Sequence, residues 1–130
     1  KGVVKKVPLI EFARIQQSGK KAIKLDDDDD VIDVKITDGS KEVILATRMG
    51  KALRIKENTV RPMGRSARGV TGIRLQKNDQ LCGLCIVDED SLMLMITEYG
   101  FGKRLDFEHY MPHGRATSGQ RYYKCSESKK

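Results

Sequence analysis

The feature that most constrains this chain is an internal repeat with an interval of about fifty residues. Glycines at positions 19, 69 and 119 are each followed, four to six residues later, by a triplet with a basic residue at its centre: Ile-Lys-Leu at 23–25, Ile-Arg-Leu at 73–75 and Tyr-Lys-Cys at 123–125. Gly50 and Gly100 keep the interval, whereas Gly2 lies only 48 residues before Gly50, so one loop between residues 12 and 19 is two residues shorter in the first copy. Such a period, built from short apolar runs, is typical of propeller-like blades or a related array.

Short runs rich in Val, Ile, Leu and Thr, bounded by Gly, Asp, Asn or Ser, predict strands rather than helices. We expect each unit to hold about four strands, which makes the fold class all-β. Asp38-Gly39 predicts a hairpin turn, and Gly50 and Gly100 stand where a positive φ is needed. The predicted strands cover residues 3–4, 22–25, 31–36, 43–47, 52–55, 72–75, 81–87 and 92–97.

The repeat divides the chain into two full units, 2–49 and 50–99, and the first half of a third, 100–130. Radial repeat folds have about four to eight blades. We therefore expect the chain to be a fragment of a longer array, in agreement with the missing initiator Met. An unpaired strand at the edge of such a fragment is expected to pair with another copy or to exchange a strand with it.

The net charge of +7 and the pI near 9.4 favour a polyanion as partner, although a basic globular domain without such a partner has the same charge. No apolar run approaches the roughly 20 residues of a membrane span, and no signal peptide precedes the first strand. Three cysteines without framework spacing fit a reducing cytosol. We therefore expect a cytoplasmic protein without a membrane partner.

The connection at residues 60–69 carries Arg61, Arg65 and Arg68, and no acidic residue lies between Glu57 and Asp79. Arginines on a glycine-bearing loop are suited to phosphate oxygens. The alternative is a solvated loop tip without a ligand. The recurrence of cations in this part of the other two repeats argues against that alternative; these cations are Lys20, Lys21 and Lys24 and Arg115, Arg121 and Lys124.

Two clusters resemble metal sites. In the acidic run 26–30 only Asp29 has an acidic counterpart, Asp79, and calcium-loop spacing is absent; we expect this turn to lie far from the anion-binding face. Cys82 and Cys85 with His109 and His113 imitate zinc ligands, but cysteines three apart in a strand point to opposite faces. We therefore expect no metal and no cofactor. We also expect no catalytic site, because neither histidine has a nucleophile in the same motif.

Residues 2–12, 33–39, 46–54, 60–75 and 97–104 resemble the C-terminal domain of bacterial DNA gyrase A, most specifically in Arg-Pro-Met-Gly-Arg at 61–65. The C-terminal domain of topoisomerase IV is a weaker match. The resemblance implies a β-pinwheel, typically of six blades that exchange a strand, around whose basic rim DNA bends. The family's Gln-Arg-Arg-Gly-Gly-(Lys or Arg)-Gly box is absent here, as are the strand-passing tyrosine and the ATPase, which belong to other parts of gyrase.

We therefore hypothesise that the chain binds and wraps duplex DNA without sequence specificity, near the nucleoid, in support of ATP-dependent negative supercoiling by the gyrase holoenzyme. The implied partners are DNA, the other blades and N-terminal domain of gyrase A, and gyrase B. A scaffold that docks an acidic protein is the alternative. The predicted DNA-binding residues are Lys5, Lys6, Lys20, Lys21, Lys51, Arg54, Arg61, Arg65, Arg68, Arg74, Lys103, Arg104, Arg115 and Arg121.

Overall fold

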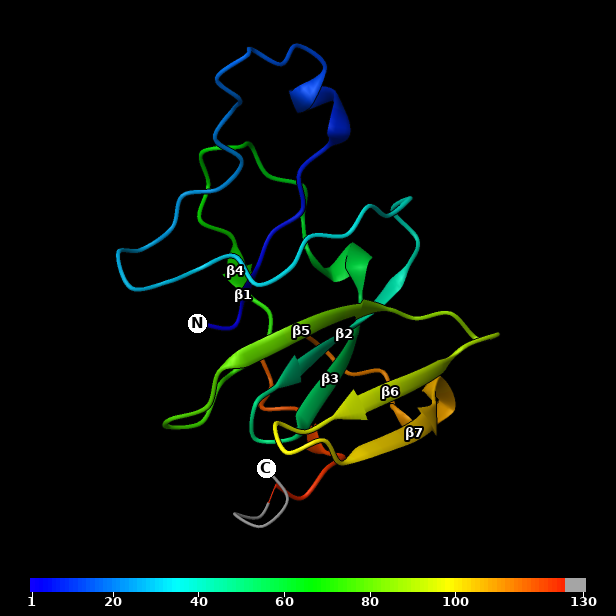
Figure 1. Cartoon of the computed structure of the whole chain (residues 1–130). Coiled ribbons are helices and arrows are strands. Elements are labelled where there is room, and N and C mark those ends of the chain that lie inside the picture. Colours follow the sequence, from blue (N-terminus) through cyan, green and yellow to red (C-terminus); the bar gives the residue numbers. More distant parts are fainter. Residues whose placement is uncertain (126–130) are drawn as a thin grey trace.

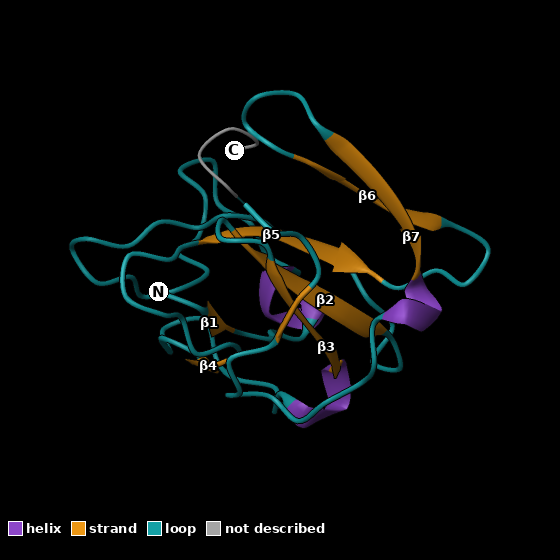
Figure 2. Cartoon of the chain, turned by 90° about the horizontal axis from the view of Figure 1, so that it is seen from below, coloured by secondary structure: helices purple, strands orange, loops and turns teal. Residues whose placement is uncertain are grey.

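A computed structural model describes residues 1–125 as three antiparallel sheets joined by loops and short 3₁₀ turns (Figures 1 and 2). The central sheet has the strand order β5-β2-β3-β8, and the pair β1-β4 and the hairpin β6-β7 form the other two sheets. The all-β expectation is confirmed. The strands are β1 (Val3–Val4), β2 (Glu42–Thr47), β3 (Lys51–Lys56), β4 (Val70–Thr71), β5 (Leu81–Ile86), β6 (Leu92–Ile96), β7 (Gly102–Asp106) and β8 (Gln120–Arg121), and the 3₁₀ turns are η1 (Leu9–Phe12), η2 (Glu57–Thr59) and η3 (Phe107–His109).

The central sheet takes its strands from all three sequence repeats. β2 comes from the first, β3 and β5 from the second, and β8 from the third. The second repeat does hold four strands, β3 to β6, as expected, but these are distributed over three sheets. Neighbouring repeats therefore share sheets, and no sheet is made by one repeat alone.

Strand pairing follows the same register in successive repeats. Lys51 pairs with Arg121 where Val3 pairs with Thr71. Val3 and Lys51 are 48 residues apart in the sequence, whereas their partners Thr71 and Arg121 are 50 apart. The shorter loop of the first repeat predicts this difference of two residues. The parallel bridges Lys6–Pro62 and Arg54–Pro112 are related by the same offsets. The sequence repeat is therefore a structural repeat.

Two predicted strands, 22–25 and 31–36, do not form. The counterpart of 31–36 is β5, which pairs with β2, the strand directly before Gly50. The corresponding partner of 31–36 would have to lie directly before Gly2, and the described residues provide none. Val34 and Ile36 are accordingly 74% and 75% exposed. The segment 22–25 makes only one described backbone hydrogen bond to the next repeat, from Lys24 N to Ala67 O at 3.3 Å.

The predicted strand 72–75 does not form either, because β4 ends at Thr71 and Ile73 keeps only a single bridge to Thr117. The turn at Asp38-Gly39 forms, with Gly39 at φ 96° and Ser40 N donating to Asp38 Oδ1. A strand follows this turn but none precedes it, so it does not close a hairpin.

The two inner strands of the central sheet, β2 and β3, are buried on both faces, because neighbouring repeats cover them from either side. On one face Leu45 packs in a cluster with Leu53, Ile55, Val60 and Ile73. On the opposite face Ile44 packs with Ala52, Phe107 and Tyr110, to which Met93 and Leu105 of the β6-β7 hairpin are added. Successive residues of a strand point to opposite faces, so a strand covered on both sides reads as continuously apolar.

The repeated glycines stand where the backbones of two repeats meet. Gly50 has φ 79°, and a Cβ there would lie 2.1 Å from Tyr123 O. A Cβ at Gly2 would lie 2.4 Å from Ile73 O, the equivalent contact. Gly100 has a similar φ of 85°, but nothing lies within 4 Å of its Cβ position. Glycine is therefore required at position 50 both by the positive φ and by the close backbone contact, and at position 100 by the positive φ alone.

We expect Gly50→Ala to lower the free energy of unfolding by more than Gly100→Ala does. Both changes place a side chain in the left-handed region, which costs about 1–2 kcal/mol. Only Gly50→Ala adds a collision with backbone, for which about 1–3 kcal/mol more is expected. Urea unfolding followed by circular dichroism measures both, and equal losses would contradict the proposed role of backbone contact at Gly50.

The buried phenol of Tyr110 is expected to make the free energy of unfolding depend on pH in the alkaline range. Burial, the neighbouring Tyr122 and Cys85 raise its pKa to about 12, whereas an unfolded tyrosine has a pKa of about 10. Between these values the unfolded chain loses the phenol proton and the folded chain keeps it, so the free energy of unfolding falls as pH rises. We expect Tyr110→Phe to flatten this fall. The exposed Tyr99→Phe should leave it unchanged, and an equally steep fall in Tyr110→Phe would refute the assignment; urea midpoints measured from pH 9 to pH 12 provide the test.

Candidate nucleic-acid interface

The structure divides the predicted DNA-binding residues into two groups. In one group the charged nitrogen donates to a backbone carbonyl or pairs with a carboxylate within the chain. In the other group, no side-chain hydrogen bond or ion pair is described within residues 1–125. The first group is Lys5, Lys6, Arg54, Arg65, Arg68, Lys103 and Arg115, and the second is Lys20, Lys21, Lys51, Arg61, Arg74, Arg104 and Arg121.

Lys5 is fully occupied by the loops around it. Its Nζ donates to Ala22 O at 2.8 Å, Arg65 O at 2.6 Å and Ala67 O at 2.9 Å. Burial, and then the positive charge of Arg65, lower the pKa of Lys5. An ammonium has three donors, so Lys5 has none left for a phosphate in this conformation and instead holds two loops together.

Lys6 and Arg54 hold equivalent 3₁₀ turns of successive repeats. Lys6 Nζ donates to Glu57 O at 3.1 Å, at the start of η2. Arg54 Nη1 donates to Phe107 O at 2.9 Å, at the start of η3, and its Nε pairs with the Glu42 carboxylate. The two cations stand at the same place in the repeat, so their first role here is to join each strand to the turn of the following repeat.

Arg65 and Arg115 form a second equivalent pair. Nη1 of Arg65 donates to Lys21 O at 3.1 Å, and Nη1 of Arg115 donates to Thr71 O at 3.1 Å. Arg115 Nε also donates to Thr59 O at 3.1 Å. Both guanidinium groups therefore fasten their own loop to the backbone of the preceding repeat.

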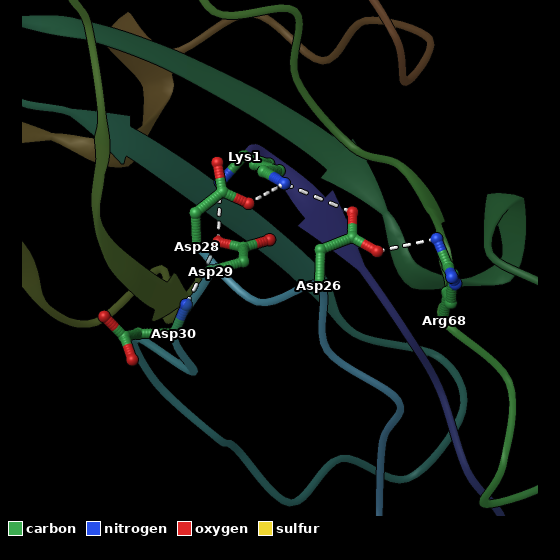
Figure 3. Close-up of polar contacts among 6 residues, drawn as sticks. All are labelled: Lys1, Asp26, Asp28, Asp29, Asp30 and Arg68. Carbon is green, nitrogen blue, oxygen red and sulfur yellow. Dashed lines mark hydrogen bonds and ion pairs between the residues drawn. The ribbon is translucent and has the colours of Figure 1, made fainter.

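Arg68 lies against the acidic run, contrary to expectation. Its Nη1 is 2.6 Å from Asp26 Oδ1, and Lys1 Nζ is 3.2 Å from Asp26 Oδ2 and also pairs with Asp28 (Figure 3). The prediction that this acidic turn lies far from the basic loop is wrong. The turn instead neutralises one of the arginines of that loop, while the Arg68 side chain remains 61% exposed.

The one position of the acidic run 26–30 that keeps an acid in the second repeat has a structural role. Asp79 Oδ1 accepts a hydrogen bond from Met49 N at 2.9 Å. Asp29 Oδ1 accepts one from the backbone nitrogen of Lys1 at 3.0 Å, which is the equivalent contact. Both donors directly precede a glycine of positive φ, Gly50 or Gly2. Comparison of the repeats identified the position, but only the structure shows that the carboxylate fixes the turn.

Arg74 is an exposed cation with an exposed cation at the same position of each other repeat, Lys24 and Lys124. We call Lys24, Arg74 and Lys124 the cation series. The backbone holds two of its members alike: Lys24 N donates to Ala67 O at 3.3 Å and Arg74 N donates to Thr117 O at 2.8 Å. Within residues 1–125, no side-chain partner of these three cations is described. The three exposed positions recur at intervals of 50 residues in the sequence.

The cysteine and histidine residues form no cluster. Among residues 1–125 no group of three or more His, Cys, Asp or Glu side chains could hold a metal ion. Cys82 and Cys85 lie in β5, as predicted, and burial raises the pKa of both thiols. His113 Nε2 instead lies 3.2 Å from Gln120 Nε2. No helix in the described part of the chain is long and apolar enough to cross a membrane.

Comparison with known proteins decides the family. The family model described as "DNA gyrase C-terminal domain, beta-propeller" matches residues 1–38, 41–84 and 92–127. The chain belongs to the DNA gyrase C-terminal domain family. DNA gyrase A of Pseudomonas aeruginosa is 45% identical over 118 residues, which are 91% of this chain and 13% of that protein. DNA gyrase A of Escherichia coli K12 is 43% identical over 126 residues, which are 97% of this chain and 14% of that protein.

Solved structures of gyrase-type C-terminal domains have the same fold. A DNA gyrase A C-terminal domain superposes with a TM-score of 0.88 at 29% identity, covering 98% of this chain and 42% of the other. The C-terminal domain of DNA topoisomerase IV superposes with a TM-score of 0.87 at 31% identity, covering 93% and 38%. This member of the gyrase C-terminal domain family thus spans less than half of either solved domain.

We expect Asp79→Ala to destabilise the fold, because Met49 N and Gln80 N both donate to the carboxylate that it removes. Hydrogen bonds to a charged group contribute about 1.5–3 kcal/mol each, and removing the acceptor leaves the Met49 N–H without its partner. Asp27→Ala removes an exposed aspartate and is the matched control. Urea unfolding of both variants provides the measurement, and equal midpoints would show that the Asp79 contacts do not stabilise the turn.

Proposed function

We propose that the chain binds duplex DNA through phosphate contacts made by the exposed cations, and that the cation series carries this binding. The supporting observation is that Lys24, Arg74 and Lys124 are exposed at one position of successive repeats, with similar backbone contacts at Lys24 and Arg74. Phosphates recur at regular steps along a duplex, so cations at regular steps can meet them in succession.

The remaining charges of the chain favour the same partner. Its net charge is +7, and the second group adds exposed cations on the strands and loops next to the series: Lys21, Arg61, Arg104 and Arg121. Phosphate contacts position a protein on DNA without reading its sequence. Binding is therefore proposed to be non-specific and strongly dependent on salt.

We further propose that the residues held by backbone carbonyls serve this surface indirectly. Lys5 and Arg65 fasten the loops from which exposed cations project. Cations on fastened loops lose little entropy on meeting DNA, and preorganisation of this kind raises affinity. In the parent protein, blades of this type would bend the duplex around the rim, and the gyrase holoenzyme would use the bend for ATP-dependent negative supercoiling in the cytoplasm. ATP hydrolysis and strand passage would belong to other parts of gyrase.

The double variant Lys24→Ala/Arg74→Ala should weaken binding to a random-sequence duplex. If each side chain neutralises one phosphate, the slope of log affinity against log salt should become shallower by about 2. Fluorescence anisotropy with a labelled duplex of about 40 base pairs, between roughly 50 and 200 mM salt, measures the slope.

The matched control is Lys56→Ala/Lys77→Ala, which removes the same charge at two exposed positions. The counterparts of Lys56 and Lys77 in the other repeats are Asp106 and Asp27, so no cation series passes through them. The control should change the slope much less. If both double variants reduce the slope equally, binding depends on net charge alone, and if an acidic peptide binds as tightly as DNA at every salt concentration, the protein-docking alternative is favoured.

A further inference from the structure

Arg68 differs from the other predicted DNA-binding residues in what holds its side chain. The side chain is 61% exposed, and its Nη1 lies 2.6 Å from Oδ1 of Asp26, whose side chain is 38% exposed. Figure 3 shows Arg68 on one side of this carboxylate and Lys1 on the other. Among residues 1–125, Arg54 is the other predicted residue with a carboxylate partner, and its side chain is only 11% exposed. Arg68 is therefore an exposed cation whose charge is already compensated from within the chain.

The ion pair joins two positions at which the repeats differ. The counterparts of Arg68 in the other repeats are Ser18 and Ser118, and the counterpart of Asp26 in the second repeat is Gln76. The junction between the second and third repeats thus has a serine and a glutamine in place of the ion pair. Both junctions nevertheless keep the same backbone hydrogen bond from the cation series to the loop of the following repeat, at 3.3 Å and 2.8 Å. The fold therefore does not require the ion pair.

A carboxylate and a DNA phosphate are alternative partners for one guanidinium group. Arginine donates to the oxygens of either anion through the same N–H groups, so an N–H that donates to Asp26 is not available to a phosphate. The pair can be opened, because exposed ion pairs contribute little to stability. Asp26 is not left without a partner when it opens, since its Oδ2 also accepts from Lys1 Nζ at 3.2 Å. Arg68 can thus leave Asp26 for another anion at small cost.

The rest of the acidic run repels the same ligand without contacting Arg68. Asp27, Asp28 and Asp30 are exposed, and none of their counterparts in the second repeat, residues 77, 78 and 80, is acidic. A phosphate that approaches Arg68 also meets these like charges. Such repulsion does not depend on the identity of residue 68, whereas competition for the guanidinium does. An experiment can therefore separate the two effects.

We propose that Asp26 is an internal competitor of DNA phosphates for Arg68, an autoinhibitory contact at the junction of the first and second repeats. The inference rests on the proposed function, because its ligand is the same duplex DNA. A duplex reaches Arg68 only when a phosphate oxygen replaces the Asp26 carboxylate. In that exchange the phosphate releases a counterion, but Asp26 attracts a cation in its turn, so Arg68 adds little to the salt dependence of binding.

Four chains make up the test: the wild type, Asp26→Asn, Arg68→Ala and the double variant. Fluorescence anisotropy with a labelled random-sequence duplex of about 40 base pairs is measured between roughly 50 and 200 mM salt. We expect Asp26→Asn to tighten binding about two- to fivefold at the lowest salt, the range of an exposed ion pair. Arg68→Ala should make the slope of log affinity against log salt shallower by about 1 in the Asp26→Asn chain, and by much less in the wild type.

The matched control is Asp27→Asn, which removes the same charge from the same turn. Within residues 1–125, no side-chain partner of Asp27 is described. This change should tighten binding less than Asp26→Asn, and it should leave the effect of Arg68→Ala as small as in the wild type. Circular dichroism and urea unfolding check that each variant folds, as expected from the junction that has Ser118 and Gln76 instead of the ion pair.

Equal tightening by the two asparagine variants, with the same effect of Arg68→Ala in every chain, would overturn the inference, since it would show general repulsion by the acidic run. A lack of tightening by Asp26→Asn in a chain whose wild type binds the duplex would also overturn it, and would leave the proposed function intact. If neither the wild type nor Asp26→Asn binds the duplex, the proposed function fails and the inference fails with it. Binding by Asp26→Asn alone would support inhibition at its strongest.

Discussion

The structure depends on close contact between the backbones of neighbouring repeats at the repeated glycines. Gly50 O accepts hydrogen bonds from Tyr122 N and Tyr123 N at 3.0 and 3.1 Å, and Gly2 O accepts the equivalent pair from Gly72 N and Ile73 N at 2.9 and 3.1 Å. A Cβ on either glycine would collide with the carbonyl of its partner. Each repeat is thus completed by backbone from the next, so stability resides in the interfaces between repeats, as in other repeat proteins.

Much of this arrangement could be predicted from the sequence, because glycine spacing and strand patterns are local signals. The repeat interval, the short first loop, the glycine turns and the strands β2, β3, β5 and β6 all followed from it. The segment 31–36 shows the limit. Its pattern of Val and Ile favours a strand, but a strand also needs a neighbour for its backbone hydrogen bonds. The sequence of the segment alone does not show whether that neighbour is present.

The cations show a second limit of the same kind. Sequence position placed Lys5, Arg65 and Arg74 in one class, because each recurs as a cation or lies near a glycine-bearing loop. In the structure Lys5 and Arg65 are occupied by carbonyl oxygens, while Arg74 is not. One signal was available for Arg54, which stands between the buried Leu53 and Ile55 and is therefore confined to the sheet. No comparable signal separates Arg65 from Arg61.

The division between basic residues held by carbonyl oxygens and exposed basic residues is relevant to how a duplex could be bent. Bending 20–30 base pairs by 40–90° costs of order 1–6 kcal/mol, and a cation that moves freely follows a straight duplex as readily as a curved one. Bending therefore requires cations at fixed places along a curved frame. In the proposed mode of binding, this frame would be made by the repeated contacts of Lys6 and Arg54 with the 3₁₀ turns, and of Arg65 and Arg115 with the preceding loops. The spacing of the exposed cations would then depend on the basic residues that are held by backbone carbonyls.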